Sequence, residues 1–270
     1  METVVRRLLG PTVRRVRREV QWRRTPGLRL TRRDPAGFGH EVAVHATPLF
    51  RDLAGVERRL QENKVVNLAL ALDRLDGLVL DPGSRFSFWW HVGRPTARRG
   101  VLDAMVLDHG RVTQGTGGGL CQLTNLIYWM TLHTPLTVVE RWRHSYDVFP
   151  DNGRSQPFGS GATCAYPVLD LQIENRTPTA FRLGLGLSAT HLHGTWTAAE
   201  PWPMRYQVYE ADHLMTNEGP GVFMRHNVIR RRVIDPDGAE VADELVAANQ
   251  ALLMYQPFLE AGPGERPTEG

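Results

Sequence analysis

The chain is poor in cysteine and has no long apolar run. Cys121 and Cys164 are the two cysteines among 270 residues, too few for a disulfide framework, and neither CxxC nor HxxxH spacing occurs. No stretch of about 18 apolar residues exists, so no transmembrane helix is expected. The first 24 residues contain no uninterrupted apolar segment, so no signal peptide is expected. We therefore expect a protein that is cytoplasmic or peripheral at the membrane.

Positive charge is concentrated near the start of the chain. Residues 1–33 contain eleven arginines against Glu2 and Glu19, a net charge of +9, whereas the whole chain carries +3. The other residues therefore carry about −6, and they include no basic patch with interleaved aromatic residues. Because a nucleic-acid-binding domain places its positive charge on the folded surface, no nucleic-acid partner is expected.

The basic segment has the pattern of an amphipathic helix. Leu9, Val13, Val16 and Val20 recur at helical spacing with arginines between them, which predicts a helix over residues 1–24. Two roles fit this pattern. The apolar stripe could contact an anionic membrane surface, or it could pack on the folded domain and leave the arginines in solvent.

The rest of the sequence predicts an α+β fold with N-terminal helices. Periodic apolar residues over 53–75 indicate a helix that Gly77 would end. Residues 121–134 indicate a second helix, which is apolar nearly all round and should be buried. The run "FSFWW" is typical of an alternating strand. The residues after 168 predict a β-rich antiparallel C-terminal half with an Asp-Gly turn at 237–238 and a separate last strand, "NQALLMYQP".

Three parts of the chain are predicted from these patterns. Residues 1–33 form a basic arm that is mainly helical, residues 34–260 form a single domain, and residues 261–270 form a disordered tail. Hydrophobic residues make up 41% of the chain, which is enough for a sizeable core.

Cys121 follows three glycines and begins the second predicted helix. The sequence reads "GTGGGLCQLTNLIYWM" from Gly115 to Met130. A helix N-terminus carries partial positive charge and free N–H groups, which favour a thiolate and lower the pKa of a cysteine there. The same N–H groups can hold a developing oxyanion, and glycines let a substrate approach the backbone. The stretch suits a nucleophilic cysteine; the alternative is a buried structural cysteine after a glycine turn.

A cysteine nucleophile needs a general base, and ten histidines are candidates. His144, in "VVERWRHSYDVFP", is the best placed because it ends an apolar run within a polar cluster. Asp147 or Asp151 would orient its imidazole, and Ser145 is a weaker choice. The alternative is a histidine that makes only ordinary hydrogen bonds.

Other kinds of site have little support in the spacing of residues. A zinc set of Cys121, Cys164, His109 and His144 lacks the usual motif spacing, so no metal is expected. No Gly-Lys-Ser/Thr follows the glycine run, which argues against a phosphate loop. No cofactor is expected either, and Cys164 is interpreted as a core residue at the start of a strand.

Two runs of residues resemble the VanW family, which is named for vancomycin B-type resistance. "GGGLCQLTNLIYW" and "VVERWRHSYDVFP" together are specific for it. Further segments are similar to the family, among them "QENKVVNLALALDRLDGLVLDPGSRFSFWWHVGRPT" and "GSGATCAYPVLDLQIENRTP", while "GVFMRHNVIRRRV" and "NQALLMYQP" resemble its shorter, stand-alone type. The resemblance covers roughly residues 42–257.

The resemblance implies a chemistry. VanW domains have been linked to L,D-transpeptidation, in which a cysteine acyl-enzyme cross-links peptidoglycan stem peptides. By position, Cys121 would be the nucleophile and His144 the base. Alternatives to catalysis are a muropeptide- or glycopeptide-binding accessory protein and a partner protein for other resistance enzymes.

The implied substrate is a peptidoglycan stem peptide or a precursor of it. The residues that would bind it come from the glycine run and the histidine run: Gly117, Gly118, Gly119, Gln122, Arg141 and Arg143. Either arginine would hold a stem carboxylate in a bidentate pair, although surface arginines on a strand usually bind nothing specific.

Overall fold

The computed structural model describes residues 2–34, 36, 38–50, 57–108, 110–148 and 156–255. Several predictions from the sequence fall on residues outside these ranges. They are the disordered tail at 261–270, the first turn of the helix predicted from residue 53, and the candidate residues His109 and Asp151.

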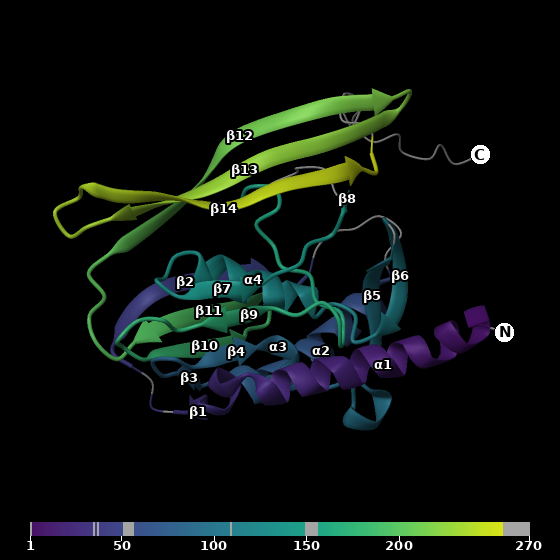
Figure 1. The fold of residues 1–270 in the computed structure, drawn as a ribbon, viewed down its shortest axis with the longest axis horizontal. Helices are drawn as coiled ribbons and strands as arrows, with labels where there is room; N and C mark the ends of the chain where they lie inside the picture. The colour runs from purple at the N-terminus through teal and green to yellow at the C-terminus, as the bar shows by residue number, and fades with distance from the viewer. Residues whose placement is uncertain are drawn as a thin grey trace.

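Helices and strands follow one another in the order of Figure 1. The helices are α1 (Glu2–Arg24), η1 (Pro26–Arg29), α2 (Arg58–Leu75), α3 (Phe88–Val92), η2 (Ala97–Arg99) and α4 (Cys121–Thr131). The first strands are β1 (Arg32–Arg33), β2 (His40–Pro48), β3 (Leu78–Leu80), β4 (Arg85–Ser87), β5 (Asp103–Asp108), β6 (Arg111–Thr116), β7 (Thr137–Glu140) and β8 (Tyr146–Asp147). The later strands are β9 (Gln172–Glu174), β10 (Phe181–Leu187), β11 (His191–Ala198), β12 (Arg205–Gly219), β13 (Val222–Ile234) and β14 (Glu240–Leu253).

The predicted α+β class is confirmed. The α-helices come from the first half of the chain. The strands from β9 onward pair antiparallel with their sequence neighbours or with earlier strands, apart from the short parallel pairing of β14 with β8. Within the described chain, no helix is long and apolar enough to cross a bilayer.

The main layer is a sheet in the order β1-β3-β10-β11-β2, against which α2 and α4 pack. Trp196 of β11 is fully buried beneath α4, and its indole Nε1 donates to the hydroxyl of Thr131 at 3.2 Å. Gly194, two residues earlier on β11, lies where α4 crosses, because a Cβ there would come within 2.5 Å of the Met130 side chain. The close crossing fixes α4, and with it Cys121, on the sheet.

A second layer, formed by β12, β13, β14 and β8, lies over the first (Figure 1). Arg231 of β13 joins the layers by donating to the carbonyls of Leu132 and Thr134, just beyond the C-terminal end of α4. The short strand β8 pairs in parallel with the end of β14. The second layer therefore holds the segment that follows His144.

Two local predictions were wrong. "FSFWW" is not one strand, because Ser87 caps a helix: its hydroxyl accepts the Trp90 N–H at 3.2 Å, and the buried Asp170 accepts the Trp89 N–H at 3.1 Å. "NQALLMYQP" does not begin a separate strand, because its first residues continue β14, which tolerates register shifts against β13 and runs to Leu253.

Candidate functional site

Cys121 is the first residue of α4, as predicted, and a tight glycine turn leads into it. Gly117 and Gly119 have φ of 84° and 85°, a left-handed conformation that favours glycine. The N-cap residue, Leu120, has no side-chain capping bond. Within the described chain, no acceptor takes up the backbone N–H groups of Gly119, Leu120 and Cys121. The helix head therefore offers unpaired donors beside the thiol.

The glycine run owes its composition to close packing by the protein itself. A Cβ on Gly118 would lie 2.3 Å from the carbonyl oxygen of Ala104 on β5. A Cβ on Gly119 would lie 2.1 Å from Cγ of the buried Lys64 on α2. These contacts fill the space beside the glycines, so only their backbone remains to face a substrate. The role of Gly117, Gly118 and Gly119 in shaping an acyl site stays a prediction.

Cys121 and Cys164 lie side by side. Their Sγ atoms are 3.8 Å apart, and the backbone N–H of Cys164 donates to the Sγ of Cys121 at 3.5 Å. Both thiols are free and half-buried. Cys164 packs, partly buried, against the hydrophobic core, but it does not begin a strand as predicted: it belongs to an irregular segment that runs against the head of α4.

The two thiols have opposite shifts in pKa. The hydrogen bond from the Cys164 thiol lowers the pKa of Cys121 well below its ordinary value and outweighs the opposing effect of burial. Hydrogen bonding and charge of the His144 imidazole, and the Cys164 N–H, lower it further. Burial, followed by the neighbouring Cys121, raises the pKa of Cys164 well above its ordinary value. The pair therefore favours the thiolate form of Cys121 and the protonated form of Cys164.

Hydrogen bonds hold the segment that carries Cys164 against α4. The hydroxyl of Thr124 donates to the carbonyl of Ala162, and the side-chain oxygen of Asn125 accepts the Ala162 N–H at 2.7 Å. The Thr163 N–H donates to the carbonyl of Trp142 at 2.7 Å. The segments of Cys164 and His144 therefore run together past the first turns of the same helix.

Arg141 has a structural role in this arrangement. Its guanidinium donates to the carbonyls of Gly159 and Gly161 and to the side chain of Asn249 on β14. It also lies over the ring of Tyr128. Because these carbonyls take up its donors, we expect Arg141 to hold the Cys164 segment in place, and substrate binding by Arg141 stays a prediction.

Among the described residues, Arg143 makes fewer hydrogen bonds through its guanidinium than Arg141 does. It is half-buried, and its described bond goes to the carbonyl of its neighbour His144 at 3.0 Å. The Gln122 amide points elsewhere: its Nε2 donates to Thr47 and to the carbonyl of Pro48, which ties α4 to the end of β2. Substrate binding by either residue stays a prediction.

Asp147, the predicted orienting residue for His144, is buried on β8. Its described partners are Arg225, at 3.5 Å, and the hydroxyl of Tyr255, at 3.2 Å. The carboxylate therefore ties β8 to β13 within the second layer, and its action on His144 stays a prediction.

Cys164 was missed as a site residue, because its partnership with Cys121 depends on contacts 43 positions apart in the chain. The one signal in the sequence was the presence of a second cysteine in a chain that has two. Among the described residues, no group of three or more His, Cys, Asp or Glu side chains could hold a metal ion.

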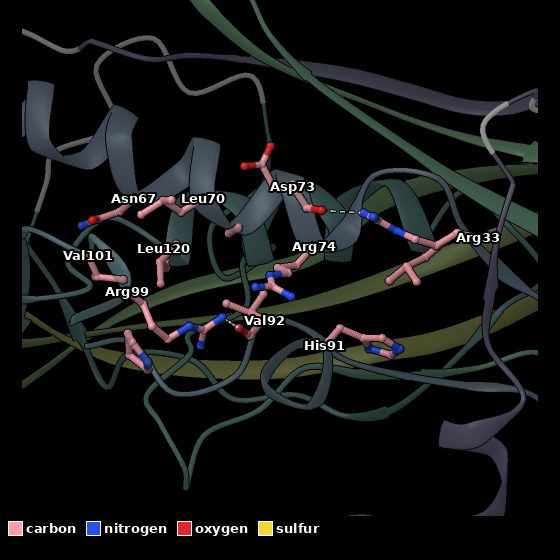
Figure 2. A pocket seen from close by; sticks show the side chains of 13 residues that line it. Arg33, Asn67, Leu70, Asp73, Arg74, His91, Val92, Arg99, Val101 and Leu120 are labelled. Carbon is pink, nitrogen blue, oxygen red and sulfur yellow. Dashed lines mark hydrogen bonds between the residues drawn. The ribbon is translucent and has the colours of Figure 1, made fainter. Parts of the chain in front are cut away.

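A cavity of about 570 Å³ lies on the α2 side of the α4 head. Figure 2 shows Arg33, Arg74 and Arg99 around it with His91. Arg33 and Arg99 bond to backbone carbonyls, which do not neutralise their charge. Leu120, directly before Cys121, forms part of the wall, whereas the two thiols do not line it. The cavity is therefore distinct from the thiol pair.

These features define an α+β protein with a thiol of lowered pKa at a helix head, next to a histidine and a second thiol. The family model described as "VanW like protein" matches residues 63–197, a span that includes Cys121, His144 and Cys164. The chain belongs to the VanW family.

Two relatives extend this result. The chain is 30% identical over 207 residues to "Vancomycin B-type resistance protein VanW" of Enterococcus faecalis, a match that covers 77% of this chain and 75% of that protein. It is 28% identical over 113 residues to "Uncharacterized protein YoaR" of Bacillus subtilis, covering 41% of this chain and 35% of that one. No solved structure matches the chain significantly.

Proposed function

We propose that the protein is a cysteine-dependent acyl transferase acting on peptidoglycan stem peptides, in the manner of an L,D-transpeptidase. The name of the Enterococcus relative supports a place in vancomycin resistance. The observation that carries the proposal is the environment of the Cys121 Sγ: the head of α4, a backbone N–H at 3.5 Å, a thiol at 3.8 Å and the His144 imidazole.

In the first half-reaction, the Cys121 thiolate attacks an amide carbonyl of the stem peptide. The C–S bond forms, the C–N bond breaks, and the proton that His144 took from the thiol passes to the leaving amine. The depressed pKa of Cys121 supplies the thiolate before the substrate arrives.

The tetrahedral intermediate places negative charge on the former carbonyl oxygen. The N–H groups of Gly119, Leu120 and Cys121 are the donors that the helix head supplies for it, since no acceptor in the described chain uses them. Removal of one such donor typically lowers kcat about 100- to 1000-fold. The rigid glycine turn keeps these donors in place without a rearrangement during the reaction.

In the second half-reaction, an acceptor amine attacks the thioester. His144 removes a proton from the amine, the new C–N bond forms, and the Cys121 thiolate leaves. Water in place of the amine gives hydrolysis. Arg143 binds a carboxylate of the stem, because its guanidinium, unlike that of Arg141, is not occupied by several partners within the described chain.

The test is mass spectrometry of the intact protein after incubation with a stem tetrapeptide. We expect an acyl adduct that peptide mapping assigns to Cys121. Cys121→Ala should form none while its fold is retained. Cys164→Ala is the matched control, which keeps the nucleophile and should still form the adduct more slowly. An adduct on Cys164 alone, or wild-type turnover by Cys121→Ala, would contradict the proposal.

The second candidate function is binding of a muropeptide or glycopeptide without catalysis. The arginine-lined cavity beside Leu120 favours it, because it offers positive charge and an apolar wall to one ligand. Titration calorimetry with the stem tetrapeptide separates the two: a binding module keeps its affinity in Cys121→Ala and loses it in Arg74→Ala. The enzyme forms the adduct irrespective of Arg74.

A further inference from the structure

The outer face of α1 carries an uncovered apolar stripe. The side chains of Val13, Val16 and Val20 are 60%, 56% and 41% exposed. Residues 12–17 are all exposed, and the N-terminal end of the helix reaches the margin of the molecule (Figure 1). The alternative of a stripe that packs on the domain, left open by the sequence, is therefore contradicted.

The opposite face of α1 is the one that docks. Arg18 forms a bidentate pair with Glu140, with both N···O distances 2.7 Å, and also donates to the carbonyl of Pro167. Trp22 is 4% exposed, and its indole Nε1 donates to the buried carboxylate of Asp170 at 3.3 Å. These two buried anchors fix the rotation of the helix about its axis.

Helical geometry shows that the domain cannot cover the stripe. At about 100° per residue, Val13, Val16 and Val20 fall within about 60° of one another. Arg18 and Trp22 lie roughly 150–170° from the middle of the stripe. Rotation of α1 to bury the valines would break the Arg18–Glu140 pair and expose Trp22. The stripe therefore faces away from the domain as long as α1 stays docked.

Positive charge borders the stripe. Arg17 and Arg24 follow one edge of it and Arg14 lies farther round, while Arg23 lies along the other edge. Arg14, Arg17 and Arg24 are exposed and have no ion pair within the described chain. An apolar strip flanked by free guanidinium groups matches the interface of an anionic lipid bilayer, where acyl chains meet negatively charged headgroups.

We propose that α1 lies in the plane of an anionic lipid surface, with its valine stripe among the acyl chains and its arginines at the headgroups. A helix of this kind is buried about 5–10 Å into the boundary between headgroups and acyl chains. A second copy of the chain fits the stripe less well, because pairing two such helices would bring their arginines together. The contact does not depend on the chemistry of Cys121.

The experiment is flotation of the full chain with two kinds of vesicle, phosphatidylcholine alone and phosphatidylcholine mixed with phosphatidylglycerol. We expect binding to the anionic vesicles that weakens with salt, and at least tenfold less binding to the neutral ones. The double variant Val16→Glu, Val20→Glu should lose at least tenfold in binding. Val241→Glu is the matched control, because Val241 is 54% exposed on β14, and it should bind like the wild type.

Arg17→Gln with Arg24→Gln tests the charge separately. This variant should bind anionic vesicles more weakly and show a shallower salt dependence, whereas Arg98→Gln, at an exposed arginine of η2, should change neither. Equal binding of the wild type and the double glutamate variant would overturn the proposal. So would a wild-type dimer in light scattering that the glutamate variant dissociates, since the stripe would then be a protein interface.

Discussion

Cys164 surrounds the Sγ of Cys121 with three polar groups: its backbone N–H donates to that Sγ at 3.5 Å, its own Sγ lies 3.8 Å away, and its carbonyl oxygen lies at 3.6 Å as an acceptor for the protonated Cys121 thiol. The backbone donor is fixed by the hydrogen bonds that hold residues 161–164 against α4, and burial raises the pKa of Cys164, which favours a protonated thiol as the second donor. A thiolate with two donors at a helix head is stabilised over the thiol. We therefore expect the second cysteine to act on the first as a positioning and pKa-setting residue.

Replacement of Cys164 should raise the pKa of Cys121. In Cys164→Ala the side-chain hydrogen bond that lowers the pKa most is lost, while burial continues to raise it, so the pKa of Cys121 rises. The ultraviolet absorbance of the thiolate during a pH titration measures it. Cys164→Ser keeps a donor and should lie between the wild type and the alanine variant. An unchanged pKa of Cys121 in Cys164→Ala would show that Cys164 does not lower it.

Arg141 and Arg143 should separate into a structural and a substrate-binding residue. Arg141→Ala leaves the carbonyls of Gly159 and Gly161 without donors, which should lower the free energy of unfolding by about 2–3 kcal/mol. Arg143→Ala should change stability by less than about 0.5 kcal/mol and raise KM for stem peptides. Urea unfolding and steady-state kinetics provide the two measurements. The reverse pattern would show that the roles are exchanged.

Gly118→Ala should disrupt the head of α4 by overpacking. The added methyl would meet the Ala104 carbonyl oxygen at 2.3 Å, and backbone cannot move aside as a flexible side chain can. We expect a loss of about 1–3 kcal/mol in unfolding free energy, together with slower alkylation of Cys121. Gly219→Ala is the control, because nothing lies within 4 Å of a Cβ there. Equal stability of the two variants would contradict the packing argument.

His91 should make the protein sensitive to acid. Burial lowers the pKa of His91 to about 4, against 6.5 for a free histidine, and its Nδ1 lies 2.7 Å from the Ser87 carbonyl. Between these two pH values the unfolded chain binds a proton that the folded chain does not, so stability falls as the pH falls. The loss over this window is about 3 kcal/mol. Urea unfolding at neutral and acid pH measures this dependence. The free energy of unfolding of His91→Gln should change less with pH than that of the wild type, and an equal change in both would contradict a lowered pKa of His91.

The sequence predicted the fold class, the helix headed by Cys121 and the basic helix at the start of the chain, because each rests on local periodicity or on capping. It could not separate the strand from the helix in "FSFWW". There the deciding acceptor is Asp170, a residue 83 positions from Ser87 whose carboxylate also receives the Ser87 hydroxyl at 2.6 Å. Such long-range capping leaves no trace in the local pattern.

The sequence likewise identified the part of the candidate site that depends on local pattern and missed the part that depends on long-range contacts. Cys121 is identified by its place at a helix head, which is a local property. Cys164 acquires its role through the fold of an irregular segment, and the ties of Arg141 to Gly159, Gly161 and Asn249 cross between the two layers. Side chains whose partners come from distant strands cannot be assigned from their neighbours in sequence.

The most direct test of a reactive Cys121 is the pH dependence of its alkylation by iodoacetamide, read by peptide mapping so that Cys121 and Cys164 are counted separately. We expect Cys121 in the folded wild type to be labelled rapidly at pH values well below about 8.5, the pKa of a free cysteine, while Cys164 is not. Labelling of Cys121 that begins only near that pH, or only after unfolding, would contradict this expectation.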